Sequence, residues 1–325
     1  MPEGVLADDA LFRSGETVAE HVVLKRLGTI GAADRYLARG PDGESRMLGI
    51  VGVRHAEMAD RLRELGATAV RHPNVVPLLD VVMVGTSPVL ITEPVDPDTT
   101  LRMVLDRGPL PGDTALTLFR GMVEGLAACH AAGLTHRDLR PENVVVADRI
   151  ARVMDLGVAT AMFDLVSAGR SVTTSGHTIG RPHYWAPERA RKPQAADARS
   201  DLFSLGCILY ELFAGKGPFA GLNLYDCYHA TLEEKYAPLD TVRPDTPPAV
   251  LHLVPLLLRT DPAKRPQSCT ELLERLDQFT LEGAEPERPA PSPVVAAAPD
   301  RRPLWLALAV AAVVVLGGAA WWALA

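Results

Sequence analysis

Residues 136–143 read His-Arg-Asp-Leu-Arg-Pro-Glu-Asn and place a carboxylate, a guanidinium and an amide on one short loop. Apolar residues at i, i+3 and i+4 spacing over 114–132 predict a helix before this loop, and the apolar run 144–146 predicts a strand after it. Phosphoryl transfer requires such a set: an acidic group for the hydroxyl proton, a cation for the moving phosphate and an oxygen ligand for Mg²⁺.

This string resembles the catalytic loop of protein kinases and departs from it only at Arg140, where serine/threonine kinases usually carry lysine. The resemblance implies that Asp138 orients the substrate hydroxyl and accepts its proton. It implies that Arg140 contacts the γ-phosphate with a differently shaped cation. Asn143 is expected to hold Mg²⁺, and His136 to pack under the metal-binding motif.

The run Asp155-Leu156-Gly157 matches the D-F-G motif of the family, with leucine in place of phenylalanine. An isolated Asp-x-Gly is more often a turn. Its position after Asn143, behind two strand-like runs, favours a metal-ligand role, and the resemblance implies that Asp155 is the principal Mg²⁺ ligand.

Later segments also resemble the family, over about residues 20–280 in all. Residues 186–188 form its Ala-Pro-Glu motif, and Arg181 stands where a threonine normally bridges to Asp138. The resemblance implies that Asp201 binds backbone amides of the catalytic loop. It also implies that Arg265 forms a buried ion pair with Glu188.

The glycine-rich hairpin that would cover the ATP phosphates is incomplete. Gly28 stands in place and Gly31 lies one position late, so these are the two expected phosphate-loop glycines. Side chains at Ile30 and Ala33 are expected to hold the loop away from the phosphates, and Arg35 replaces the valine that packs on adenine.

The next strand lacks the family's nucleotide-binding lysine. Counting from the glycine hairpin places that position at Ile50 and puts Leu48 in place of the small residue above adenine; no lysine lies between Arg26 and Asp138. Glu64 on the following helix therefore has no assigned partner. Three arginines could supply a cation, although solvated surface positions are the simpler interpretation for each: Arg35, Arg46 and Arg54.

The resemblance predicts that the remaining part of the nucleotide site is retained. Thr92 is expected at the gatekeeper position, and the backbone of Glu93 to Val95 is expected to hydrogen-bond the adenine, which requires no particular side chain. Val145 is the expected contact from the other lobe. The implied cofactors are ATP and Mg²⁺.

The composition limits the alternatives. The 325 residues carry a formal net charge of -7, which argues against a general nucleic-acid binder. Four cysteines without C-x-x-C spacing indicate buried, reduced thiols. We expect a leader (1–20), a kinase-like domain (21–281, with an N-lobe over 21–95 and a C-lobe over 96–281) and a Pro/Ala-rich linker (282–303).

The run 304–325 contains no charged residue, and its 22 residues would cover ~33 Å as a helix, enough for a bilayer core of about 30 Å. Tryptophans lie near both ends, and Arg301-Arg302 precede the run. A buried soluble helix is the alternative. We expect a single-pass, tail-anchored protein of the inner (cell) membrane with its kinase-like domain in the cytoplasm.

Together these features predict an α+β fold with a small β-rich lobe and a larger helical lobe, plus a C-terminal transmembrane helix. The function expected from the resemblance is transfer of the ATP γ-phosphate to serine or threonine of a protein substrate, with weakened nucleotide binding. The alternative is a membrane-tethered pseudokinase that acts as a docking module. Nucleotide binding and labelled phosphate transfer separate the two.

Overall fold

The computed structural model describes residues 12–31, 33–55, 57–169, 173–174, 182–192 and 196–282, with backbone only at 53–54, 173–174 and 279–282. The predicted membrane span and all but the first residue of the predicted linker lie outside the described residues, as does Arg181. Among the residues that are described, no helix combines the length and apolar character needed to cross a membrane.

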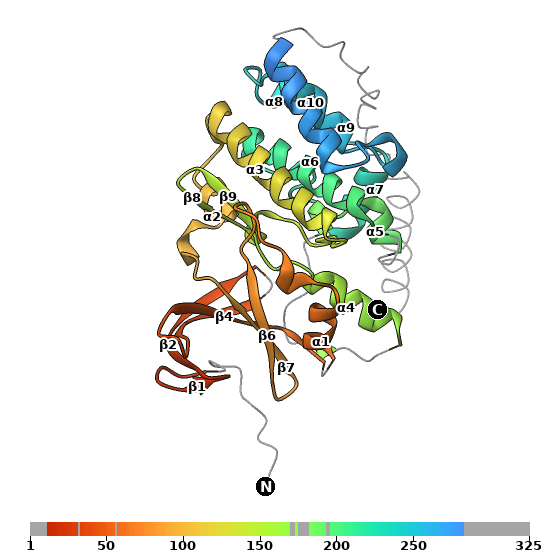
Figure 1. The fold of residues 1–325 in the computed structure, drawn as a ribbon. Coiled ribbons are helices and arrows are strands. Elements are labelled where there is room, and N and C mark those ends of the chain that lie inside the picture. Colours follow the sequence, from red (N-terminus) through yellow and green to blue (C-terminus); the bar gives the residue numbers. More distant parts are fainter. Residues whose placement is uncertain are drawn as a thin grey trace, which may run out of the picture. The chain divides into compact units, whose positions relative to one another are not determined.

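The small lobe is built on an antiparallel sheet with the strand order β1-β2-β3-β4-β7-β6 (Figure 1). Its strands are β1 (Thr17–Val18), β2 (His21–Ile30), β3 (Ala33–Arg39), β4 (Ser45–Val51), β6 (Leu78–Val84) and β7 (Ser87–Thr92). Helix α1 (Met58–Glu64) and the 3₁₀ turn η1 (Ala67–Ala69) follow the short strand β5 (Val53–Arg54). Met58 and Leu62 bury the inner face of α1.

The small lobe begins earlier than the sequence predicted. Residues 12–20 were expected to belong to a leader, yet β1 pairs with β2, and the buried Phe12 packs on Tyr36 with ring centroids 5.4 Å apart. The apolar side chains of Phe12 and Val18 therefore belong to the core of this lobe.

The large lobe is mainly helical and contains the hairpin of β8 (Val144–Ala147) and β9 (Ile150–Val153), which directly follows the predicted catalytic loop. Its helices are α2 (Leu101–Leu105), α3 (Gly112–Ala131), α4 (Val158–Ser167), α5 (Pro187–Arg191), α6 (Ala198–Ala214), α7 (Leu224–Leu232), α8 (Leu239–Val242), α9 (Pro248–Leu257) and α10 (Cys269–Glu282). The 3₁₀ turns are η2 (Pro97–Thr99), η3 (Pro141–Asn143), η4 (Pro182–Tyr184) and η6 (Pro262–Lys264). The predicted helix over 114–132 is α3, and the two-lobed kinase architecture is confirmed.

Helix α6 lies at the centre of this lobe, and residues 200–213 are buried on every side of it. Close packing explains why α6 carries a glycine: a Cβ on Gly206 would lie 2.7 Å from the Cβ of Leu257 on α9.

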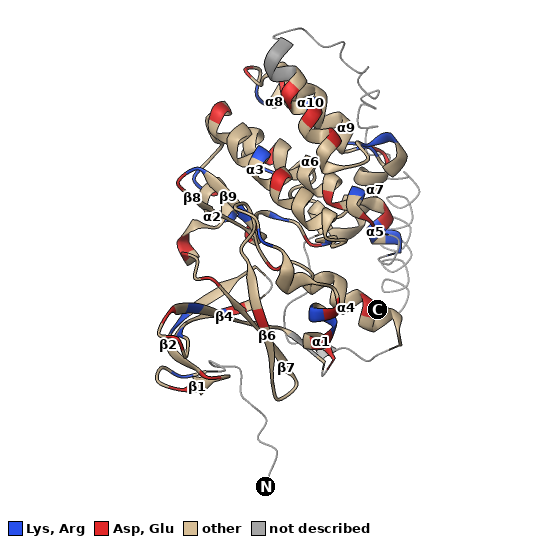
Figure 2. Ribbon diagram, viewed as in Figure 1, with Lys and Arg blue, Asp and Glu red and all other residues tan. Residues whose placement is uncertain are grey.

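All four cysteines are free and buried, as the sequence predicted. Positions of both charge signs are interspersed along the ribbon (Figure 2).

The segment after the metal-binding motif forms α4 and then β10 (Thr173–Thr174), which pairs with β5. Arg61 of α1 donates to Asp164 of α4 at 2.7 Å. Helix α1 is thereby tied to this segment, and its Glu64 is 65% exposed and pairs with Arg61 at 3.0 Å. No ion pair from Glu64 to the cleft strand β4 occurs among the described residues.

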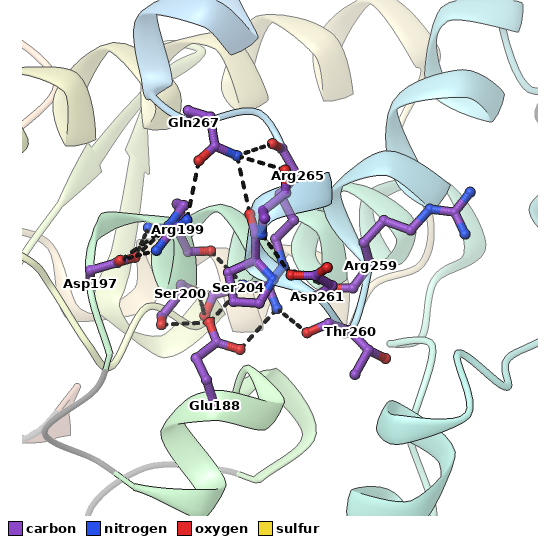
Figure 3. Close-up of polar contacts among 12 residues, drawn as sticks. Glu188, Asp197, Arg199, Ser200, Ser204, Arg259, Thr260, Asp261, Arg265 and Gln267 are labelled. Carbon is purple, nitrogen blue, oxygen red and sulfur yellow. Dashed lines mark hydrogen bonds and ion pairs between the residues drawn. The ribbon is translucent and has the colours of Figure 1, made fainter.

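The predicted ion pair between Arg265 and Glu188 is confirmed (Figure 3). Both guanidinium Nη atoms donate to the carboxylate, at 2.7 and 2.9 Å. Arg265 also donates to the carbonyls of Arg199, Arg259 and Thr260, and its side chain is fully buried. A bidentate pair with this many satisfied donors joins α5 to the loop before α10.

Removing the Arg265 charge should destabilise the large lobe, because it leaves Glu188 partly buried without its partner. We expect Arg265→Met to lower the free energy of unfolding by about 3 kcal/mol or more. Denaturant titration followed by circular dichroism measures this. Arg275→Met is the matched control, since its pair with Glu271 is much more exposed (39% and 33%) and should contribute less than about 1 kcal/mol. Equal losses in the two variants would contradict the structural role of Arg265.

Candidate active site

The catalytic loop holds its carboxylate, cation and amide within contact of one another. Asp138 is 5% exposed, and Arg140 donates from Nε to its Oδ2 at 3.2 Å. Asn143 donates from Nδ2 to the backbone carbonyl of Asp138 at 2.7 Å and to Oδ2 at 3.2 Å. The Asn143 amide thus fixes the loop and turns its own oxygen away from Asp138.

A buried carboxylate on α6 shapes this loop. Asp201 accepts from the backbone N–H groups of His136 and Arg137 at 2.8 and 2.9 Å and contacts the His130 ring at 2.8 Å. These bonds hold Arg137 at φ 61°, a left-handed conformation that costs a non-glycine residue of the order of 1 kcal/mol. The predicted role of Asp201 is confirmed.

The loop is also joined to the strand that precedes Asp155. The His136 ring contacts the carbonyl of Met154 at 2.9 Å, and the Met154 N–H donates to the carbonyl of Asn143 at 2.9 Å. His136 is 1% exposed, so it packs beneath the metal-binding motif as predicted.

The two predicted metal ligands converge on one point. A Cβ on Gly31 would lie 2.7 Å from Asn143 Oδ1 and would collide with Asp155 Oδ2. Asn143 Oδ1 is buried and has no hydrogen-bond partner among the described residues. A carboxylate and an amide oxygen that approach the same position suit Mg²⁺, which prefers oxygen ligands. The donor set therefore fits the implied cation.

The expected nucleotide-binding residues lie around an apolar cluster between the lobes. Val145 packs there with Ile30, Met47, Val76 and Met154, and Val95 and Leu27 cover it. Gly28 has φ 99°, which only glycine adopts without strain. The Glu93 side chain is occupied by Arg152 at 2.7 Å, so any adenine contact from Glu93 would come from its backbone, as predicted.

The predicted lysine position is wrong by one residue. Ile50 and Leu48 pack with Tyr36 in the cluster on the opposite face of the sheet. Side chains alternate along a strand, so the cleft face of β4 carries Met47 and Gly49. Gly49, and not Ile50, occupies the position of the missing lysine, and Met47 replaces Leu48 as the residue above the expected adenine site.

Arg35 is not a surface arginine. Its side chain is fully buried, and Nη2 forms an ion pair with Asp155. The simpler interpretation given to the arginines is thus wrong for Arg35. Arg46 pairs with Asp42 at an exposed turn, as that interpretation expected.

Sequence reasoning missed a second buried arginine. Arg189 is 4% exposed, and its Nη2 lies 3.6 Å from Asp138 Oδ1. Its guanidinium stacks on Trp185 at 4.4 Å from the ring centroid. Burial lowers the pKa of Arg189 to about 10 in spite of the nearby carboxylates, so it remains charged at neutral pH. The position of Arg189 directly after the Ala-Pro-Glu motif was the one feature of the sequence that could have indicated a place near the active site.

The comparisons agree with this geometry. The family described as protein kinase domain matches residues 52–276. The chain is 36% identical over 289 residues to serine/threonine-protein kinase pkn2 of Myxococcus xanthus. These aligned residues make up 84% of this chain and 33% of pkn2. It is 33% identical over 211 residues to PknL of Mycobacterium tuberculosis, covering 64% of this chain and 51% of that protein. The chain belongs to the protein kinase domain family.

A solved structure supports the fold alone. The crystal structure of Rad53 1-466 in complex with AMP-PNP superposes with a TM-score of 0.63 at 22% identity, covering 79% of this chain and 65% of that one. The chain spans about a third to a half of the length of the two bacterial relatives above. The residues matched by the family begin at residue 52, directly after β4.

Acidification should weaken the hydrogen bonds by which Asp201 holds the catalytic loop. Burial would raise the pKa of Asp201, but the bonds from His130 and the His136 amide outweigh it and hold the pKa below its ordinary value. A lowered folded-state pKa adds stability that is complete above about pH 4 and is lost as the pH falls through that lowered pKa. Asp201→Asn should therefore destabilise the protein at pH 7 and lose less stability than wild type on acidification.

Urea unfolding at pH 7, 5, 4 and 3 measures this difference. Asp245→Asn is the control, because its side chain is 73% exposed and the variant should follow the wild-type curve. A constant offset between wild type and Asp201→Asn at every pH would contradict the linkage.

Proposed function

We propose that this chain is a serine/threonine protein kinase that transfers the γ-phosphate of ATP to a protein hydroxyl. The observation that carries the proposal is the convergence of Asp138, Asn143 and Asp155 on one buried site. The names of the relatives support the same activity. The substrate class, a protein serine or threonine, is part of the proposal.

Each residue has a role that its position supports. Asp138 accepts the proton of the attacking hydroxyl, and Arg140 holds positive charge beside it, at 3.2 Å from the carboxylate. Asn143 and Asp155 hold Mg²⁺, which neutralises phosphate charge when bound. In the described conformation both carboxylates contact arginines: Asp155 contacts Arg35, and Asp138 lies 3.2 Å from Arg140 and 3.6 Å from Arg189. Binding of Mg²⁺ at Asp155 would therefore require the Arg35 side chain to move.

Removing the Asp138 carboxylate should abolish transfer while leaving the fold intact. We expect Asp138→Asn to reduce the incorporation of labelled phosphate into a general protein substrate by about 100-fold or more, because no base then accepts the hydroxyl proton. Asp148→Asn, the same change in the exposed β8–β9 turn, should retain wild-type incorporation.

Absent incorporation in the wild type, together with an unchanged melting temperature in millimolar Mg²⁺·ATP, would contradict the enzyme. A ligand that binds the native state must raise its melting temperature. That result would support the docking module instead.

We further propose that residues 304–325 anchor the protein in the inner membrane with the kinase domain in the cytoplasm. The supporting feature is a charge-free apolar run whose ~33 Å helical length exceeds the bilayer core. Arg301-Arg302 on its N-terminal side favour a cytoplasmic location for the preceding domain.

Deleting 304–325 should move the protein from the membrane fraction to the supernatant after ultracentrifugation, because the apolar segment is removed. A deletion of 288–299, which keeps the basic pair and the apolar run, should stay with the membrane. Retention of the protein without 304–325 in carbonate-washed membranes would contradict the anchor.

A further inference from the structure

No lysine lies between Arg26 and Asp138 in the sequence, so the described strands of the small lobe present none to the cleft. Gly49 occupies the position on β4 where the family carries its nucleotide-binding lysine. The lysine of β2, Lys25, is exposed and does not serve as a replacement. Phosphoryl transfer depends on cations that neutralise the triphosphate, so this deficit must be met from another position or the site must fail.

The neighbouring strand provides a cation at the same place. Arg35 on β3 is the direct cross-strand partner of Gly49. Directly opposite residues in an antiparallel pair project to the same face. A Cβ on Gly49 would lie 2.8 Å from Arg35 Cζ and 3.2 Å from its Cδ. The Arg35 side chain therefore lies across the space that a side chain at position 49 would fill.

The guanidinium of Arg35 is positioned at the predicted metal ligand and retains an unused donor. Nη2 bonds Asp155, and Nε lies 3.4 Å from the carbonyl of Ile30. Nη1 is buried and has no hydrogen-bond partner in the described part of the chain. An unsatisfied buried donor is costly, and a phosphate oxygen would satisfy it.

A second guanidinium borders the same space from the large lobe. Arg140 donates from Nη2 to the carbonyl of Gly31 at 3.1 Å, and Gly31 itself abuts Asn143 and Asp155. The predicted phosphate loop thus lies between Arg35 and Arg140, above the two metal ligands. This is where a triphosphate would meet cations from both lobes.

We propose that Arg35 is the phosphate-binding cation of this kinase, and that Gly49 is a glycine because it must admit the Arg35 side chain. The inference rests on the proposed function. In the described conformation Arg35 neutralises Asp155. With nucleotide bound, Asp155 would hold Mg²⁺, and the Arg35 guanidinium would then contact phosphate oxygens.

Arg35→Met tests the charge, because it keeps an unbranched stem. We expect the full-length chain, purified in detergent, to bind a fluorescent ATP analogue with Mg²⁺ about tenfold or more weakly than wild type, as for a lost bond to a charged group. Arg46→Met, which removes the exposed arginine of the same sheet, should bind as wild type does.

Mg²⁺ alone separates charge loss from collapse of the site. The metal competes with Arg35 for Asp155, so Arg35→Met should show a thermal shift with Mg²⁺ alone that equals or exceeds that of wild type. A variant that had lost the site would lose both responses, and that result would overturn the assignment.

The proposal that Arg35 on β3 replaces a lysine on β4 is tested directly by returning the cation to position 49. Gly49→Ala should weaken nucleotide binding, since the new Cβ displaces the guanidinium. The double variant Arg35→Val, Gly49→Lys should recover much of the affinity that Arg35→Val alone loses, because lysine then projects from β4 into the same face.

The outcomes distinguish this inference from the proposed function. Wild type that binds Mg²⁺·ATP, with an Arg35→Met variant that binds equally or more tightly, would overturn the role of Arg35 and leave the kinase standing. Wild type that binds no nucleotide would overturn both. Recovery in the double variant supports both at once.

Discussion

The buried ion pair between Arg35 and Asp155 joins the small lobe to the predicted metal-binding motif. Burying either charged group without a partner would carry a large desolvation cost, and in the pair each group compensates the charge of the other. The pair exists because Gly49 has no side chain in its path. The guanidinium also lies 3.4 Å from the carbonyl of Ile30, next to Gly31, which abuts the two predicted metal ligands.

The large lobe neutralises its other catalytic carboxylate in the same way. Asp138 contacts Arg140 at 3.2 Å and lies 3.6 Å from Arg189. Both carboxylates are therefore matched to guanidinium groups, although buried atoms of Arg35, Arg189 and Asn143 have no hydrogen-bond partner among the described residues. Binding of substrate or metal therefore exchanges one charge partner for another, and the affinity measured is the difference between the two.

Much of the large-lobe site could be predicted because its residues are close in sequence. Asp138, Arg140 and Asn143 share one loop, so their spacing alone brings them together. The β4 strand could not be assigned by counting. Counting along the chain is accurate only to about a residue, and in a strand a shift of one residue moves every side chain to the other face. That is why Ile50 was expected in the cleft and Gly49 was found there.

The sequence by itself indicated the two-lobed kinase fold and the closeness of Asp138, Arg140 and Asn143, because these depend on local patterning and on residues that share one loop. The Arg265–Glu188 pair joins residues 77 apart and was predicted only through the family resemblance. Only the tertiary structure decided what the arginines do. Arg35 and Asp155 are 120 residues apart in the sequence. Arg189 lies 3.6 Å from Asp138, although the two residues belong to different segments of the large lobe. A guanidinium on a flexible stem can lie in solvent or in a core, and its neighbours in space, which local sequence does not specify, determine which of the two occurs.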